Sequence, residues 1–213
     1  MTVIKRRSPV VFDRRALEKV DWGEWTVVRR FEGEGEGPLL IDLSHRPRWD
    51  IQHRDLDRIY PLQRTLPQSP GACRSSDPFW FNRLNRTQAT IWQLAEEALQ
   101  MPEEAAFTAI TDATVFLALI GDTIFSITEQ LTALDLSDPS RTRPFLLQGP
   151  LAHVSCQIVV EAGTGGGARG ILLTCSRGYA RDMVSAIMDA GAHLHLQPAG
   201  EAAFQSWLKS LAV

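Results

Sequence analysis

The 213-residue chain has few cysteines, no cysteine pair at metal-binding spacing and no long apolar run. Its three cysteines, Cys73, Cys156 and Cys175, are far apart and odd in number, which favours reduced thiols over a disulfide framework. No apolar stretch approaches the ~18 residues of a membrane-spanning helix. The N-terminus also lacks the apolar segment of a secretion signal. We therefore expect a cytoplasmic protein that binds no metal.

An excess of positive charge is also missing. The formal net charge is -3 and the pI is near 6.0, whereas a protein that binds nucleic acid needs a basic face. Residues 1–15 are basic, but acidic Glu18, Asp21 and Glu24 follow them, which favours a solvated arm. A hydrophobic content of 44% and a charged content of 22% are typical of a globular chain with a sizeable core.

The composition changes near residue 100. Residues 1–104 hold most of the prolines, and only the segments 25–31 and 39–43 have the pattern of strands. The proline-rich segment 61–78 predicts an irregular excursion that lies over a neighbour. We predict that residues 1–104 are an irregular N-terminal region packed on a partner or on the second half.

One helix is expected in this first region. Ile91, Leu94 and Ala95 recur at helical spacing after Thr87, a good capping residue, and Pro102 would end the helix. The preceding segment, Arg83-Leu-Asn85-Arg86-Thr87-Gln88, would then place two guanidinium groups and two side-chain amides at a helix entrance.

The second half, residues 105–213, predicts a strand, a helix, two strands, a helix and a strand. A further amphipathic helix is expected after Gly200. Gly191 is expected to cap the C-terminus of the helix over 179–190. This order is the split βαβ, ferredoxin-like arrangement, an antiparallel sheet with helices on one face, and hence an α+β fold. The expected segments are strands 111–119, 153–161, 171–175 and 193–196, and helices from 122 or 123 and over 179–190.

Several patterns that suggest chemistry have a simpler structural interpretation. The glycine run 162–167 lies between two expected strands, so a hairpin tip is favoured over a phosphate loop, which must open a helix. His193 and His195 alternate along an expected strand, but two histidines alone do not complete a zinc site. The adjacent pair Ser44-His45 does not establish nucleophile–base geometry, and we assign no catalytic residue.

Two polar clusters are candidate sites. Arg83, Asn85 and Arg86 suit a ligand carboxylate, a phosphate or an acidic loop of a partner, although local capping with surface salt bridges is the favoured interpretation. Arg48 and Trp49 follow a predicted strand, and they suit either an interface anchor or a loop held against its own domain.

The second half also contains short motifs that resemble a known family. The motifs are Asp135-Leu136, 145–150, 172–179 (with Arg177 and Tyr179), Ala190-Gly191 and 198–200. They resemble the gamma subunit of heterotetrameric sarcosine oxidase and, more broadly, the folate-binding domain of the glycine-cleavage aminomethyltransferase family. The resemblance is continuous over about 105–205. In the first half it is fragmentary, as at Asp42-Leu-Ser-His45. The chain is shorter than a complete aminomethyltransferase and lacks the full folate-pocket fingerprint with its catalytic acidic residue.

The resemblance implies a non-catalytic accessory subunit of a multi-subunit, flavin- and folate-linked oxidoreductase that demethylates amines. Its partners would be larger flavin- or folate-binding subunits, with flavin on the partner chains, no cofactor held by this chain alone, and tetrahydrofolate left open. The alternative is a stand-alone tetrahydrofolate-dependent methyl or aminomethyl transferase, or a folate-binding protein. In it, segment 83–88 would hold the glutamate tail, and Arg177 or Tyr179 would line the pocket. A structural or regulatory module unrelated to folate is a third possibility.

Overall fold

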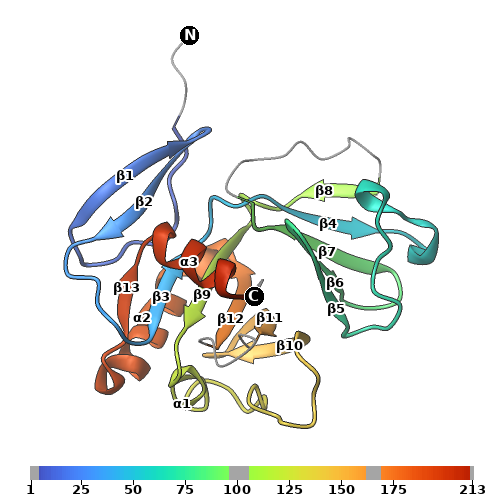
Figure 1. Ribbon diagram of the computed structural model, residues 1–213. Helices are drawn as coiled ribbons and strands as arrows, with labels where there is room; N and C mark the ends of the chain where they lie inside the picture. Colours follow the sequence, from blue (N-terminus) through green and yellow to red (C-terminus); the bar gives the residue numbers. More distant parts are fainter. Residues whose placement is uncertain (1–4, 96–105, 162–168, 212–213) are drawn as a thin grey trace.

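The computed structural model describes residues 5–95, 106–161 and 169–211, and the following account is of those residues (Figure 1). They form three sheets. The two-stranded sheet is a hairpin of β1 (Ala16–Trp22) and β2 (Trp25–Phe31). The six-stranded sheet has the order β10 (Phe145–Leu151), β11 (Val154–Glu161), β12 (Gly170–Ser176), β9 (Thr114–Ile120), β3 (Leu39–Asp42), β13 (Gln197–Ala199). The five-stranded sheet has the order β5 (Cys73–Ser76), β6 (Phe79–Arg83), β7 (Gln88–Gln93), β4 (Arg48–Gln52), β8 (Phe107–Ala109).

Helices are few in the described residues, and none of them is long and apolar enough to cross a membrane. The α-helices are α1 (Ile124–Thr128), α2 (Ala180–Gly191) and α3 (Glu201–Leu211). Short 3₁₀ turns are η1 (Leu56–Arg58), η2 (Pro61–Gln63), η4 (Arg177–Tyr179) and η5 (Ala192–Leu194).

The α+β class and the antiparallel sheet are confirmed. Strands β11, β12 and β9 are neighbours and all pair antiparallel, as a split βαβ unit requires. In that unit the last strand, β13, would lie beside β9. Here β3 from the first half of the chain is inserted between them, pairing antiparallel with β9 and parallel with β13.

The six-stranded sheet is buried on both faces. Val115, Leu117 and Leu119 of β9 pack with α1 and α2, while Phe116 and Ala118 pack on the opposite face, the one that α3 covers. Burial on both faces explains why β9 and β12 are continuous apolar runs rather than alternating patterns.

The five-stranded sheet packs against the α3 side of the six-stranded sheet. Trp92 of β7 meets Phe116 of β9 with ring centroids 5.1 Å apart, and both side chains are completely buried. The next residue toward the N-terminus, Ile91, points to the other face, where it joins a separate core with Phe79 and Phe81. The two larger sheets therefore share one core, and the five-stranded sheet has a second core of its own.

The helix predicted after Thr87 is wrong where the structure describes it, because Gln88–Gln93 is strand β7. The segment pairs antiparallel with both β4 and β6. Thr90, Ile91 and Trp92 favour an extended backbone, and their alternating side chains fill two different cores. The remainder of the predicted helix, 96–105, lies outside the described residues.

The end of the second half also differs in detail from the prediction. His193 and His195 do not lie on a strand: 192–194 is the turn η5, and the final strand is β13 at 197–199. Gly191, the expected cap, is the last residue of α2. The residue with a left-handed backbone is His195 (φ 60°), which follows η5. The amphipathic helix after Gly200 is confirmed as α3. The predicted hairpin tip 162–167 lies outside the described residues, although β11 and β12 flank it as antiparallel strands.

Each half of the sequence contributes strands to both larger sheets. Strand β3 from the first half lies inside the six-stranded sheet, and β8 from the second half forms an edge of the five-stranded sheet. The predicted boundary between 1–104 and 105–213 falls within 96–105, outside the described residues, and remains a prediction. The two larger sheets do not correspond to the two halves of the sequence.

The hairpin β1–β2 and the extended segment 5–14, called the arm below, lie beside α3 and β13 (Figure 1). A two-residue turn at Gly23 (φ 59°) joins the strands. The main chain of β2 approaches the start of α3 so closely that a Cβ on Gly200 would lie 2.3 Å from the carbonyl oxygen of Arg29. The arm is fixed by Val10, whose side chain is buried in the core beneath α1 and α2.

Candidate functional site

The loop that joins β3 to β4 carries an unusual concentration of buried polar side chains. Ser44, His45 and Arg46 are each at most 5% exposed, and Arg48 at the start of β4 is completely buried. Strand β3 enters the core between β9 and β13, so the residues that follow it remain inside the protein. The loop begins with a tight turn in which Arg46 N donates to the carbonyl of Leu43 at 2.8 Å.

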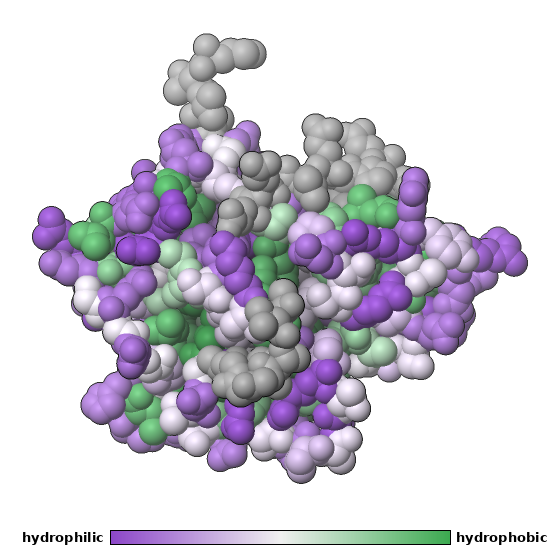
Figure 2. All heavy atoms as spheres, viewed as in Figure 1, coloured by the Kyte–Doolittle hydropathy of each residue, from purple (hydrophilic) through white to green (hydrophobic). Residues whose placement is uncertain are grey.

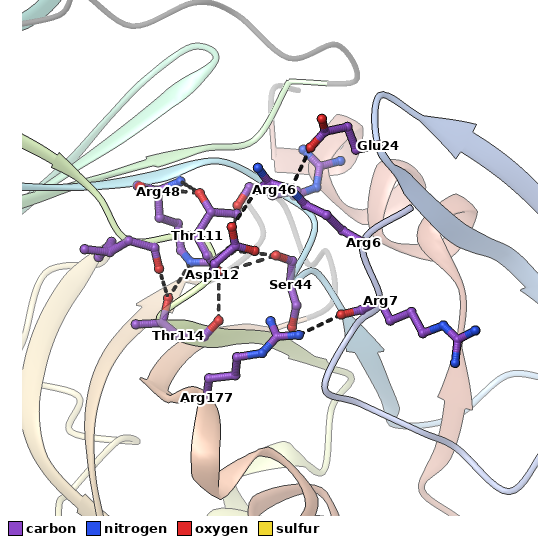
Figure 3. Close-up of polar contacts among 11 residues, drawn as sticks. Arg6, Arg7, Glu24, Ser44, Arg46, Arg48, Thr111, Asp112, Thr114 and Arg177 are labelled. Carbon is purple, nitrogen blue, oxygen red and sulfur yellow. Dashed lines mark hydrogen bonds and ion pairs between the residues drawn. The ribbon is translucent and has the colours of Figure 1, made fainter. Parts of the chain in front are cut away.

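The guanidinium of Arg48 binds oxygen atoms of the main chain and of hydroxyl groups (Figure 3). Nη1 donates to the Arg46 carbonyl at 2.6 Å, and Nη2 donates to the carbonyls of Thr111 and Thr114 at 2.9 and 3.0 Å. Burial lowers the pKa of Arg48 to about 9, opposed by the nearby carboxylates of Asp42 and Asp112, so the group stays protonated at neutral pH. Arg48 therefore fixes the β3–β4 loop to the start of β9.

Arg46 makes a second set of contacts, toward α3. Nη1 donates to the Ala95 carbonyl at 2.7 Å, Nη2 pairs with Glu201 at the first turn of α3, and the guanidinium lies 4.8 Å from the centroid of the Phe204 ring. The pair is enclosed, because the Arg46 side chain is 1% exposed and that of Glu201 is 14% exposed. Arg46 thus joins the loop to the helix on the opposite side from Arg48.

His45 lies between these two arginines and the hairpin. Its ring packs edge-on against Trp22 of β1 at 4.8 Å between centroids, and Nε2 lies 3.5 Å from Oε2 of Glu201. Burial, followed by the charges of Arg46 and Arg48, holds the pKa of His45 well below 6.5. The imidazole is therefore neutral at pH 7.

Asp42, the last residue of β3, faces the arm. Burial raises the pKa of its carboxyl group, while hydrogen bonds from Ser8 and Ser44 oppose the rise. Ser44 N donates to Oδ1 at 2.9 Å. Asp42 and His45 line the same cavity, which opens between the arm and the hairpin and has a volume of about 490 Å³.

The predicted ligand residues Arg83, Asn85 and Arg86 lie at a strand turn, not at a helix entrance. The turn joins β6 to β7, and Asn85 organises it by accepting a hydrogen bond from Thr87 N at 2.9 Å. The side chain of Arg83 is 5% exposed and donates through Nη1 to Asp57 Oδ1 at 2.6 Å. Arg83 and Arg86 both line an open polar pocket together with the segment 53–59.

The other predicted ligand residues, Arg177 and Tyr179, lie elsewhere, in η4 after β12. Arg177 Nη2 donates to the Arg7 carbonyl at 2.7 Å and so holds the arm (Figure 3), while the Tyr179 side chain is 50% exposed. In the described residues no hydrogen bond or ion pair connects this pair with Arg83 or Arg86. Arg83 ends β6 of the five-stranded sheet, whereas Arg177 and Tyr179 follow β12 of the six-stranded sheet, and a role of these residues in folate binding stays a prediction.

The predicted interface pair is divided between the core and the surface. Arg48 is completely buried, so its side chain does not reach the surface of this chain. Trp49 points to the opposite face of β4, where it is half-buried against the core of the five-stranded sheet. Only Trp49 keeps a surface that a partner chain could reach.

The cluster formed by Asp42, His45, Arg46 and Glu201 was not predicted from the sequence. Its signal was the run of polar residues directly after an apolar strand, which is unusual because a loop is normally solvated. Glu201, far away in the sequence, gave no such signal. Cys156 and Cys175 are buried, with 5% and 4% exposed. Within the described ranges, no group of three or more His, Cys, Asp or Glu side chains is placed to hold a metal ion.

These features define an α+β protein whose buried arginines hold its loops in place. Comparison with known proteins adds a likeness of fold. No protein-family model matches the chain. No curated protein matches it either. The fold is similar to that of a chain in the structure of heterotetrameric sarcosine oxidase from Corynebacterium sp. U-96 in complex with pyrrole 2-carboxylate. The TM-score is 0.58 at 11% sequence identity, and the match covers 76% of this chain and 87% of that chain. The likeness is a distant structural relationship, one of fold.

Proposed function

We propose that this chain is a non-catalytic accessory subunit of a hetero-oligomeric oxidoreductase, similar in role to the gamma subunit of sarcosine oxidase. The observation that carries the proposal is the fold likeness to a subunit of a heterotetrameric sarcosine oxidase, which extends over most of both chains. The resemblance of the short motifs in the second half led to the same expectation. The flavin, and any tetrahydrofolate, would belong to partner chains, and the substrate would be an amine such as sarcosine.

The polar core of the chain supports this role. Arg46 and Arg48 are buried and bind carbonyl oxygens and, in Arg46, the carboxylate of Glu201, so their charge fixes loops instead of facing a substrate. The face shown in Figure 2 is mostly hydrophilic, with apolar areas that are small and separate. An interface without a large apolar patch would rest on individual anchors, and Trp49 is the anchor that we propose.

Native mass spectrometry of the chain purified gently from its own host tests the proposal. We expect a stable complex with larger chains, and an absorbance spectrum of bound flavin in the same fraction. Recovery as a free monomer that binds a reduced folate by itself would contradict the subunit role and would support the folate-binding alternative. Recovery as a free monomer without folate binding would contradict both.

The proposed anchor has its own test. Trp49→Ala should weaken association with the larger chains, while the matched variant Ile59→Ala should not, although both residues are half-buried against the same core. Affinity for the purified partner is measured by surface plasmon resonance, with circular dichroism to confirm folding. Equal affinities for the two variants would remove Trp49 from the interface.

A further inference from the structure

The cavity between the arm and the hairpin has the size of a small-molecule site. Its volume is about 490 Å³, within the range of about 300–1,000 Å³ typical of ligand pockets. The arm (5–14) forms one wall, and residues from both faces of the hairpin form the other. The base is the end of β3 with the following loop, represented by Asp42 and His45.

The inner surface of this cavity is largely apolar. Val10 of the arm and Trp25, Val27 and Phe31 of β2 all line it, and each is less than 10% exposed. Phe12 packs edge-on against Phe31 with centroids 5.7 Å apart and continues the same surface. These side chains provide a rigid surface for an apolar or aromatic group.

The rim of the cavity is strongly basic. Five cationic side chains line the cavity against a single carboxylate, that of Asp42; the cations are Lys5, Arg6, Arg7, Arg14 and Lys19. Three of the five already have partners. Lys5 pairs with Asp21 at 2.5 Å, Arg6 pairs with Glu24 at 2.7 Å and with Asp112 at 2.6 Å, and Arg14 donates to Gln197 and Gly33 at 3.0 Å.

The other two cations, Arg7 and Lys19, make no side-chain hydrogen bond or ion pair with the described residues. They come from opposite walls, Arg7 from the arm and Lys19 from β1. An anion at the rim would therefore meet two positive charges that the protein has not neutralised. At the base, the carboxyl group of Asp42 would repel the same anion, so the charge distribution favours one orientation.

We propose that this cavity binds a small organic anion, with its carboxylate or phosphate group at Arg7 and Lys19 and its apolar body on the Val10, Trp25 and Phe31 surface. The apolar body provides burial and the anionic group provides orientation. The proposal concerns this chain alone and does not rest on its proposed role in an oxidoreductase complex.

The first experiment is isothermal titration calorimetry of the full chain with benzoate, phenyl phosphate and the neutral isostere benzamide. We expect benzoate or phenyl phosphate to bind, with the tighter of the two identifying the preferred anionic group. Benzamide should bind at least about tenfold more weakly, because a hydrogen bond to a charged group is worth about 1.5–3 kcal/mol. Inorganic phosphate, which lacks the apolar body, should also bind more weakly than phenyl phosphate. Benzamide binding as tightly as benzoate, or no binding of either aromatic anion, would overturn the proposal.

Three variants and a control locate the binding. Arg7→Ala and Lys19→Ala should each weaken binding of the preferred anion about five- to tenfold, because each removes one of the two charges that meet it. Ala16→Leu keeps both charges but fills the cavity from β1, and it should remove binding of both anions. The control Arg15→Ala deletes a neighbouring charge that does not line the cavity and should leave the affinity unchanged.

These variants alter side chains at the surface of the cavity, so the thermal unfolding midpoints should stay close to that of the wild type. If Arg15→Ala reduces affinity as much as Arg7→Ala, the effect is one of net charge and the proposed site is wrong. If Ala16→Leu leaves the affinity unchanged, the anion binds outside the cavity and the proposal also fails.

Discussion

The buried pair formed by Arg46 and Glu201 should be one of the strongest couplings in the molecule. It joins the β3–β4 loop to the first turn of α3, and neither side chain is more than 14% exposed. We expect that removing one partner is costly while removing both is not. The reason is that a single deletion leaves a charge in a site that water scarcely reaches.

The structure allows the size of this effect to be worked out. Breaking a fully buried ion pair by deleting one partner costs about 3–5 kcal/mol. In Glu201→Gln the guanidinium of Arg46 keeps the Ala95 carbonyl and the face of Phe204, and the new amide remains able to accept a hydrogen bond. The cost should therefore lie at or below the bottom of that range, at about 2–3 kcal/mol. Replacing both residues, as in Arg46→Met with Glu201→Leu, should change the free energy of unfolding by no more than about 1 kcal/mol.

Urea unfolding followed by tryptophan fluorescence gives the free energy of unfolding of the wild type, each single variant and the double variant. The single variants are Arg46→Met and Glu201→Leu, with Glu201→Gln as the near-isosteric comparison. We expect the loss in the double variant to be smaller than the sum of the two single losses by about 2 kcal/mol or more. A double variant whose loss equals that sum would show that the two charges do not stabilise one another, and the reasoning would be refuted.

Two further predictions concern the same side of the molecule. A Cβ on Gly170 would lie 2.0 Å from Cζ2 of Trp207, so Gly170→Ala should destabilise the protein by about 1–3 kcal/mol. A thermal melt would detect this, and Trp207→Leu should partly restore the loss; an unchanged midpoint would contradict the packing of α3 on β12. His45 has a folded-state pKa well below 6.5, so below that pH the unfolded chain binds a proton that the folded chain does not, and stability falls as the pH falls. His45→Gln should remove this contribution, which is at most about 1.4 kcal/mol per pH unit; urea titrations between about pH 7 and about pH 5 would reveal it. A variant as acid-sensitive as the wild type would show that His45 titrates normally.

The strands that the sequence revealed are those with a simple burial pattern. Residues 111–119 and 171–175 are identified as strands because they are rich in β-forming residues, and the structure buries both faces of β9 and β12. Helix α3 was recognised because only one of its faces is buried, which leaves a clear amphipathic pattern. In these segments local propensity and tertiary environment agree.

Strand β7 shows where that agreement ends. Ile91 and Leu94 have helical spacing in the sequence, but Ile91 fills the core of the five-stranded sheet and its neighbour Trp92 fills the core between the sheets. The spacing arose because neighbouring residues serve different cores, which a one-dimensional pattern cannot distinguish from a helix face. The same error placed Arg83 and Arg86 at a helix entrance when they lie at a strand turn.

The candidate site was only partly predictable for a related reason. The polar run after β3 was visible, and Arg48 was singled out, but its burial was not foreseen because its ligands are carbonyl oxygens of residues 111 and 114. Such acceptors exist at every position and have no sequence signature. The basic cavity was missed because its walls, the arm and the hairpin, meet only in the folded chain.

The loop from Asp42 to Arg48 connects the stability of the fold with the shape of the cavity. Arg46 and Arg48 hold the loop from opposite sides, and its first residues form the cavity base. Because β2 also packs against α3, the charge pair that fixes α3 supports one cavity wall as well. Glu201→Gln should therefore weaken binding of the preferred anion although Glu201 does not line the cavity. Gly170→Ala, which acts on Trp207 in the second half of α3, should lower stability with a smaller effect on that affinity. If Glu201→Gln and Gly170→Ala lower the stability equally and also weaken anion binding equally, the cavity responds only to global stability.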